Sequence, residues 1–558
     1  MTELKKIFTS LSGKERSVFV LAAAVGIIAL ITLATIVIGQ ITKVVPAKGG
    51  TYTEGIVGQP ALINPVLAET EIDKALVRLT FSRLEDVASK IEPENNGKTW
   101  RVRIKDDVKW SDGEKLTSDD IIFTVAMIND PENKSPLRAF WQGVAAERIS
   151  ELELQFSLAA PYSFFSKNLA GLYIIPAHIF KNVPPQNWRI SDYNLKPVGS
   201  GFYKFDTFGR KSDGFITDYA LKEKGLTGAT STFVSDVRFK FYENNDDLIT
   251  AFNRGQVDGI GIQSTKDLDN VRRSYKKNIF EIPSYYAVFF NQAKNPALRE
   301  WAVRKALTLT IDKKKIGEQV FGGEAAVING PTIIKNANLE TGEATSSDYS
   351  PETAIQLLEG AGWKLPDSSV NQSSTSLFRE KIIGKENIKL ELNLVVPKIS
   401  FLNDTAALLQ EMWQKAGFRV NLVSATPQEA MEKIIKNRDY EMIIFGNAPN
   451  DPQDLYPFWH SSERFAPGLN LSLYNSSRAD GLMETIRQSL IPEERASKLM
   501  DLTNTIENDY PAVFLYSPYY LYLTNKNLGG VGDGLISEPA DRFVGVSRWY
   551  LKTVRVLK

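Results

Sequence analysis

Residues 389–446 have the sequence KLELNLVVPKISFLNDTAALLQEMWQKAGFRVNLVSATPQEAMEKIIKNRDYEMIIFG, in which strand-like and helix-like patterns alternate. Three short runs rich in apolar and β-branched residues predict strands. These runs cover residues 389–396, 418–424 and 440–446. Because strands that alternate with helices along the chain are typical of α/β sheets, the stretch predicts an α/β fold.

The two segments between these strands have helical patterns. The first helix is expected over residues 404–416 and is stopped by Gly417. The second is expected to begin at Thr426 as its N-cap, with Pro427 at the first helical position. Its buried stripe is predicted to consist of Met431, Ile434 and Ile435.

A polar and aromatic loop, GNAPNDPQDLYPFWHSS at residues 446–462, follows the last of these strands. In open α/β sheets, ligands bind beyond the carboxyl ends of the strands, where connecting loops converge. The mixture of amides, carboxylates, aromatic rings and chain-breaking residues suits a shaped cleft wall. From this region we predict the ligand-binding residues Gly446, Asn447, Asp451, Asp454, Trp459 and Asn470.

The composition excludes several functional classes. Lys plus Arg number 66 and Asp plus Glu also number 66, so no overall charge favours nucleic acid as a partner. Cysteine is absent, which excludes thiolate chemistry and lipidation of a cysteine. The only histidines are His178 and His460, and we therefore predict no metal site and no cofactor.

The N-terminus contains 26 residues without a charge, from Ser17 to Thr42, which is long enough to span a bilayer. The basic residues Lys5, Lys6, Lys14 and Arg16 precede this run. The positive-inside rule then predicts a cytoplasmic tip at 1–16, a transmembrane anchor at 17–42, a linker at 43–48 and an extracytoplasmic body. The alternative is a cleaved signal sequence, although VVPAKGG at 44–50 fits a cleavage site poorly.

From Gly49 to about Lys558, the order of segments resembles extracellular solute-binding protein family 5, also called cluster C, which serves oligopeptide, dipeptide and nickel ABC importers. Single segments are weak signals, but nine of them in the family order are specific. They are GGTYTEGIVGQPALINPVLA (49–68), VKWSDGEKLTSDDIIFTV (108–125), PYSFF (161–165), IIPAHIF (174–180), PVGSGFYKF (197–205), FNRGQVD (252–258), FFNQAKNPALREWAVRKALTLTIDKKKI (289–316), SPETAIQLLEGAGW (350–363) and KAGFRVNL (415–422).

The resemblance implies a type II periplasmic-binding-protein fold, with two α/β lobes joined by two strands and an additional domain inserted in the first lobe. For this chain it implies a first lobe at 49–283 with the insert at about 83–190, a second lobe at 284–516 and a C-terminal return to the first lobe at 517–558.

The crossing strands would correspond to residues 281–291 and 511–523, both rich in Tyr and Phe. In the family, such residues line the cleft near the hinge. We therefore add Tyr285, Tyr286 and Asn291 to the predicted ligand-binding residues. Ordinary core packing is the alternative for each aromatic side chain.

The implied function is the substrate-capturing component of an ABC importer, a monomer that binds a peptide or other small solute without chemistry and delivers it to permease subunits. In peptide-binding members, an aspartate after the last second-lobe strand pairs with the α-ammonium of the ligand. Alignment on Asp451 and Pro452 places this position at Ala448. Either Asp451 or Asp454 substitutes for the missing carboxylate, or the ligand lacks a free amine.

Two other functions use the same residues. A membrane-tethered sensor or chaperone would have an identical cleft, and co-purification with permease subunits would distinguish it. An anchored hydrolase would require Asp451, Asp454 or His460 to act as acid, base or ligand. The chain has no H-E-x-x-H motif and no G-x-S-x-G elbow at a plausible strand-to-helix turn, which argues against a hydrolase.

Overall fold

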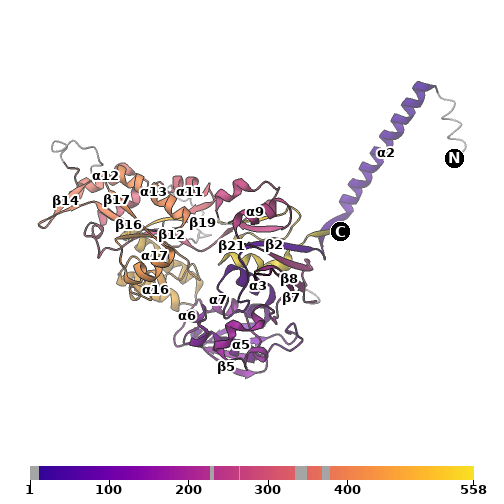
Figure 1. Ribbon diagram of the computed structural model, residues 1–558, viewed down its shortest axis with the longest axis horizontal. Coiled ribbons are helices and arrows are strands. Elements are labelled where there is room, and N and C mark those ends of the chain that lie inside the picture. Colours follow the sequence, from indigo (N-terminus) through magenta and orange to yellow (C-terminus); the bar gives the residue numbers. More distant parts are fainter. Residues whose placement is uncertain (1–11, 226–230, 263, 333–348, 367–377) are drawn as a thin grey trace.

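The computed structural model describes residues 12–225, 231–262, 264–332, 349–366 and 378–558. Within these residues the chain forms two lobes around separate mixed β-sheets, and one long helix projects away from both lobes (Figure 1). Residues 1–11, most of the predicted cytoplasmic tip, lie outside the described residues.

The first lobe contains an eight-stranded sheet. Its order is β21 (Gly534–Leu535), β11 (Lys276–Glu281), β20 (Tyr520–Thr524), β10 (Gly259–Ile262), β2 (Thr51–Val57), β9 (Asp236–Tyr242), β8 (Ile216–Glu223) and β7 (Tyr203–Arg210). The central strands β10, β2 and β9 run parallel to one another. Helix α9 (Asn245–Asn253) packs on these three strands, and α3 (Glu71–Thr80) contacts β7.

A smaller antiparallel sheet lies in the first half of the chain. Its order is β3 (Ala88–Glu94), β4 (Thr99–Ile104), β6 (Glu153–Ser157) and β5 (Ala145–Ser150). Helix α5 (Ser118–Asn129) covers it and begins at a capping box formed by Thr117 and Asp120. Trp100 and Val102 of β4 belong to the same buried cluster as Tyr52 of β2, so the small sheet shares one hydrophobic core with the first lobe.

The second lobe contains a six-stranded sheet. Its order is β13 (Ala325–Val327), β19 (Ala512–Pro518), β12 (Tyr285–Phe290), β18 (Met442–Asn447), β16 (Glu391–Pro397) and β17 (Arg419–Ala425). The three strands predicted from residues 389–446 are β16, β17 and β18, and β16 pairs in parallel with both others. The predicted α/β arrangement is confirmed for this stretch.

The two helices between these strands differ in detail from the prediction. Helix α13 (Ser400–Lys415) begins four residues before the predicted start at 404. Thr426 caps α14 (Pro427–Glu429) as predicted, since its hydroxyl accepts a hydrogen bond from the Glu429 amide at 3.1 Å.

The predicted buried stripe of the second helix is wrong at Met431, whose side chain is 49% exposed. The chain after α14 continues as the π-helical segment η8 (Ala430–Ile435). A π turn contains more residues than an α turn, so a stripe counted at the α-helical period is displaced. Ala430 and Ile435 are the buried residues of this segment.

The described chain passes between the two large sheets at two places. It leaves the first lobe between the end of β11 at Glu281 and the start of β12 at Tyr285. It returns at Tyr519, between β19 and β20. Both crossings lie within the segments 281–291 and 511–523 that the family resemblance singles out.

Helix α2 (Gly13–Ile41) projects from the body and has no buried residue (Figure 1). It continues directly into β1 (Thr42–Ala47), which pairs antiparallel with β22 (Lys552–Leu557). The residues predicted as a linker, 43–48, are therefore mostly a paired strand. The C-terminus lies at the base of α2.

Candidate functional site

Three of the predicted residues form one buried hydrogen-bonded group at the carboxyl end of β18. Tyr285, the first residue of β12, lies opposite Asn447, the last residue of β18. The Tyr285 hydroxyl accepts hydrogen bonds from Asn447 Nδ2 and from the indole Nε1 of Trp459, both at 3.0 Å. Burial raises the pKa of Tyr285 above its ordinary value, which keeps the phenol neutral. This group positions the start of the loop at 446–462.

Gly446 and Tyr286 form the next pair along these strands. A Cβ on Gly446 would lie 2.8 Å from Cε1 of Tyr286, so the glycine leaves room for the ring. The Tyr286 ring also contacts Tyr516 and Phe401, with centroids 5.7 and 5.1 Å away. Only a residue without a side chain fits at 446 while the ring keeps this place.

Asp454 is almost completely buried, and its charge is compensated from two sides. Arg487 of helix α16 (Ser477–Gln488) makes a bidentate ion pair with it, at 2.8 Å from Nε to Oδ1 and 2.8 Å from Nη2 to Oδ2. The Tyr162 hydroxyl donates a third hydrogen bond to Oδ2 at 3.0 Å. Burial and the Asp454 carboxylate raise the pKa of Tyr162, so this donor keeps its proton. A ligand ammonium would have to break these contacts to reach Asp454.

Asp451 is less constrained. One carboxylate oxygen accepts a hydrogen bond from the Gln453 amide at 2.8 Å. The other lies 3.5 Å from the ammonium of Lys167, whose side chain is 40% exposed. Ala448, where the family pattern implies a carboxylate, is exposed and apolar. Of the two carboxylates predicted in the loop, Asp451 therefore has the longer ion pair.

The loop and helix α16 both contact a segment of the first lobe, residues 162–168. The amide and hydroxyl of Ser163 donate to the carbonyls of Arg487 and Ile486, at 2.7 and 2.9 Å. Asn450 Nδ2 donates to Asn168 Oδ1 at 3.2 Å. In the sequence this segment is marked only by the motif PYSFF, from which no site residue is predicted. No local pattern predicts a site here, because the residues that this segment contacts are far away along the chain.

Two predicted residues lie apart from this group. Asn291 follows the other end of β12, and its side chain donates to the Arg438 carbonyl at 3.0 Å. Asn470 is fully buried and donates to the carbonyls of Trp459, His460 and Tyr474. Both side-chain amides are hydrogen-bonded to the backbone of their own lobe.

The residues considered for a hydrolase are not assembled into one. The His460 ring stacks on Tyr456 with centroids 3.9 Å apart. Its Nε2 is closest to carboxylates of α16, 3.5 Å from Glu484 and 3.8 Å from Asp480. Across the described part of the chain, no group of three or more His, Asp or Glu side chains could hold a metal ion.

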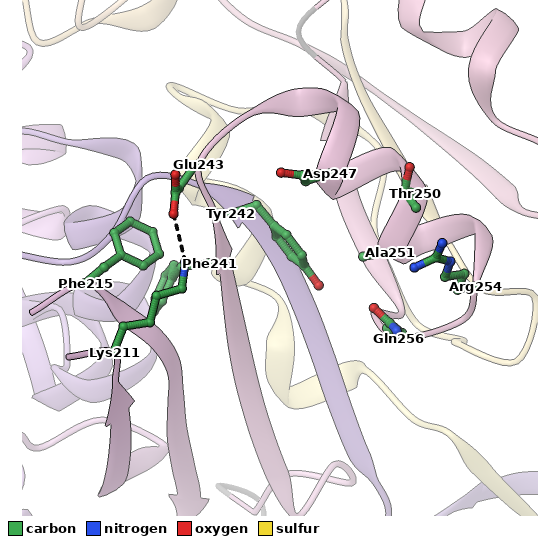
Figure 2. A pocket seen from close by; sticks show the side chains of 10 residues that line it. All are labelled: Lys211, Phe215, Phe241, Tyr242, Glu243, Asp247, Thr250, Ala251, Arg254 and Gln256. Carbon is green, nitrogen blue, oxygen red and sulfur yellow. Dashed lines mark hydrogen bonds and ion pairs between the residues drawn. The ribbon is translucent and has the colours of Figure 1, made fainter. Parts of the chain in front are cut away.

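A separate hollow of about 300 Å³ lies in the first lobe between α9 and the hairpin of β7 and β8 (Figure 2). Lys211 and Glu243 form an ion pair at 2.8 Å on one side of it, and Asp247 of α9 and Arg254, which follows α9, lie on the other. Its lining residues include none of the predicted ligand-binding residues.

A comparison with family sequence models gives one match across most of the chain. The model of the bacterial extracellular solute-binding proteins, family 5 Middle, matches residues 65–466. The chain belongs to this family. The recognised fold class, two α/β lobes of the periplasmic-binding-protein kind, is thereby confirmed.

Family 5 relatives match nearly the whole length of the chain. The oligopeptide-binding protein AppA of Bacillus subtilis (strain 168) is 23% identical over 522 residues, which cover 91% of this chain and 92% of AppA. The solved structure of AppA in complex with a nonapeptide matches with a TM-score of 0.67, covering 91% of this chain and 100% of AppA.

Two further proteins show the breadth of the family. The ABC transporter substrate binding protein CtaP of Listeria monocytogenes has 22% identity and a TM-score of 0.73, covering 90% of this chain and 99% of CtaP. The nickel-binding periplasmic protein of Escherichia coli (strain K12) is 25% identical over 391 residues, which cover 66% of this chain and 67% of that protein. Family 5 proteins are solute-binding components of ABC importers and not enzymes, so the hydrolase hypothesis is set aside.

Proposed function

We propose that this family 5 protein is a membrane-tethered receptor that captures peptides outside the cell by closing its lobes and passes them to an ABC permease. The observation that carries the proposal is the hydrogen bond from Tyr162 of one lobe to Asp454 of the other. Asp454 lies in the loop after β18, at the edge of the sheet where α/β proteins bind ligands.

Lobe closure is supported by how the two lobes are connected. The chain crosses between the sheets at 282–284 and at 519, so a small number of backbone torsions in these segments can rotate one lobe against the other. Away from the crossings, the lobes touch through polar contacts, such as Tyr162 with Asp454 and Lys266 with Asp404 at 2.8 Å. They also touch through Phe164, which packs into the hydrophobic cluster of the second lobe. The polar contacts can form and break without disrupting a hydrophobic core, and lobe opening would withdraw only the Phe164 ring from the cluster of the second lobe.

A peptide ligand is supported by the relatives and by Asp451. AppA is named an oligopeptide-binding protein and was solved with a nonapeptide. Asp451 can accept a peptide ammonium in place of Lys167, since that ion pair is long and partly exposed. A bare metal ion is a weaker candidate, because the described residues offer no cluster of three metal-ligating side chains.

Membrane tethering is supported by α2 and by the strand that follows it. The helix has 29 residues, and its most apolar window has a mean hydropathy of 2.8. The same helix would also suit a signal sequence. Cleavage within residues 44–50 would remove most of β1, which is paired with β22 along its full length. Retention of the helix preserves this pairing.

The test is mass spectrometry under native conditions on the purified full chain in detergent, followed by calorimetric titration with defined peptides. We expect a co-purifying peptide or saturable binding of added peptides without cleavage. A soluble chain for these titrations should begin at Thr42 and not at Gly49, so that β1 is kept. The peptide assignment fails if no peptide binds while another class of solute does.

A further inference from the structure

Strands β1 and β22 form a two-stranded ribbon directly at the base of α2 (Figure 1). Thr42 lies opposite Leu557 and Val44 opposite Arg555. The amide of Lys558 donates a hydrogen bond to the Ile41 carbonyl, in the last turn of α2, at 2.9 Å. The last residues of the chain are thus held against the residues that emerge from the helix.

The ribbon is basic in a chain whose charges otherwise balance. The segments 42–48 (TKVVPAK) and 551–558 (LKTVRVLK) contain no acidic residue. Their basic residues are Lys43, Lys48, Lys552, Arg555 and Lys558, and all five are exposed. Among the described residues, only Lys48 of these five has an ion-pair partner, Glu223 at 3.5 Å. Since the whole chain has 66 basic and 66 acidic residues, the excess of basic residues is local to the ribbon.

The ribbon also exposes apolar side chains next to these charges. Leu557 is 74% exposed, and Val44 and Val554 are 55% and 48% exposed. Directly opposite and alternate residues of an antiparallel pair share a face, so Val44, Arg555 and Leu557 lie on the same side of the ribbon. An exposed leucine beside basic residues is typical of a surface at the boundary between headgroups and acyl chains.

Geometry places this surface at the membrane if α2 is the anchor. The uncharged run from Ser17 to Thr42 spans about 39 Å at about 1.5 Å per residue, compared with about 40–45 Å for a whole bilayer. Thr42 then lies in the headgroup layer. Lys43, Arg555 and Lys558 lie within about two residues of Thr42 or of its partner Leu557 along the strands, which is about 7 Å.

We propose that the end of the β1–β22 ribbon binds the headgroups of anionic phospholipids, with Leu557 in the interface and the basic residues at the phosphates. Arg555 lies on the face of Leu557, Lys43 on the opposite face and Lys558 at the end of the ribbon. The inference rests on the proposed anchor. Its consequence is that the first lobe is held at the bilayer by a short ribbon and not by a flexible tether. The entrance to the loop at 446–462 would then keep a defined orientation towards a permease in the same membrane.

The absence of native cysteine allows a direct test in the full chain. The variant Leu557→Cys is labelled with an apolar, polarity-sensitive dye, which takes the place of the leucine side chain. The labelled protein is reconstituted into lipid nanodiscs. Acrylamide, a neutral quencher in water, then reports exposure in discs of phosphatidylglycerol and of phosphatidylcholine. We expect the quenching constant to be at least about threefold lower in phosphatidylglycerol, because each basic residue near an anionic surface shifts the docking equilibrium constant about fivefold.

The charge variant Lys43→Gln/Arg555→Gln/Lys558→Gln should raise the quenching constant to its value in phosphatidylcholine. Its matched control is Lys314→Gln/Lys433→Gln/Lys436→Gln, which removes three exposed lysines of the second lobe and should leave the difference unchanged. Equal quenching in both lipids would overturn the inference.

A dye on Ile31→Cys, at the middle of α2, separates this failure from failure of the anchor. If Ile31 is protected while Leu557 is equally quenched in both lipids, the anchor stands and the ribbon does not bind headgroups. If Ile31 is itself open to acrylamide, the anchor fails and the ribbon inference fails with it.

Discussion

The Tyr162 hydroxyl lies 3.0 Å from Oδ2 of Asp454 and joins the two lobes. Arg487 already neutralises Asp454 within the second lobe. The interlobe bond can therefore be removed without leaving a buried charge unpaired, which makes it a suitable probe of lobe closure.

We expect Tyr162→Phe to weaken peptide binding about tenfold, since a hydrogen bond to a charged group contributes about 1.5–3 kcal/mol. The closed state loses this bond and the open state does not, so the loss falls on the closing equilibrium. The melting temperature should change little. Titration calorimetry and thermal unfolding measure the two effects separately.

The matched control is Tyr456→Phe, because within the described residues the Tyr456 hydroxyl has one hydrogen-bond partner, Ser462 of its own lobe, at 3.3 Å. Affinity should stay within about twofold of the natural chain, as expected for a surface substitution. A tenfold loss in both variants would show that the effect is not specific to the interlobe bond.

Asp451→Asn tests the proposed partner of the ligand ammonium. We expect about tenfold weaker binding of peptides with a free amino terminus, because the charge-assisted hydrogen bond is lost. Binding of the same peptides after N-acetylation should be unchanged. The decisive quantity is the ratio of the dissociation constants of the acetylated and free peptides, measured by calorimetry.

The control for this substitution is Asp439→Asn, at an exposed carboxylate whose partner is Lys294 of the same lobe, at 2.9 Å. It should leave both affinities unchanged. If Asp451→Asn weakens acetylated and free peptides equally, Asp451 supports the loop and does not bind the ammonium.

Gly446→Ala should destabilise the second lobe. The new Cβ would lie 2.8 Å from the Tyr286 ring, so the ring must shift within its contacts to Phe401 and Tyr516. Overpacking of this kind costs about 1–3 kcal/mol, which lowers the melting temperature by several degrees. Gly481→Ala, in the middle of α16 where a Cβ meets nothing within 4 Å, should instead raise it slightly. Equal melting temperatures would show that the ring moves freely.

The strands of the second lobe were predictable because their signals are local. The apolar runs that became β16, β17 and β18 are each contained in about seven residues, and sheet membership follows from their alternation with helices. The stripe at Met431 was not predictable, since a π turn shifts the period without leaving a mark in the composition.

The roles of the site residues depend on distant partners. Asp454 contacts Arg487 33 positions later and Tyr162 292 positions earlier, so no local pattern distinguishes it from Asp451. Asn470 has the composition of a cleft residue, but its amide is used by three carbonyls of its own lobe. The loop could be identified from the sequence, whereas the role of each residue within it depends on tertiary contacts.

Lys224 predicts a specific dependence of stability on pH. Burial lowers the pKa of Lys224 to about 8, although its ammonium donates to the carbonyls of Lys109 and Ser200. Below pH 8 the folded state must hold a partly buried charge. Between about pH 8 and 10.5 the unfolded chain binds more protons than the folded one, so stability rises with pH in this window.

We therefore expect the difference in unfolding free energy between the natural chain and Lys224→Met to be flat below pH 8 and to increase towards pH 10. Denaturant unfolding at a series of pH values measures this difference, and other titrating groups cancel in it. The control Lys222→Met removes an exposed lysine that pairs with Asp206 at 2.8 Å, and should show no such increase. A flat difference from pH 7 to 10 for Lys224→Met would mean that water reaches this ammonium and that burial does not depress its pKa.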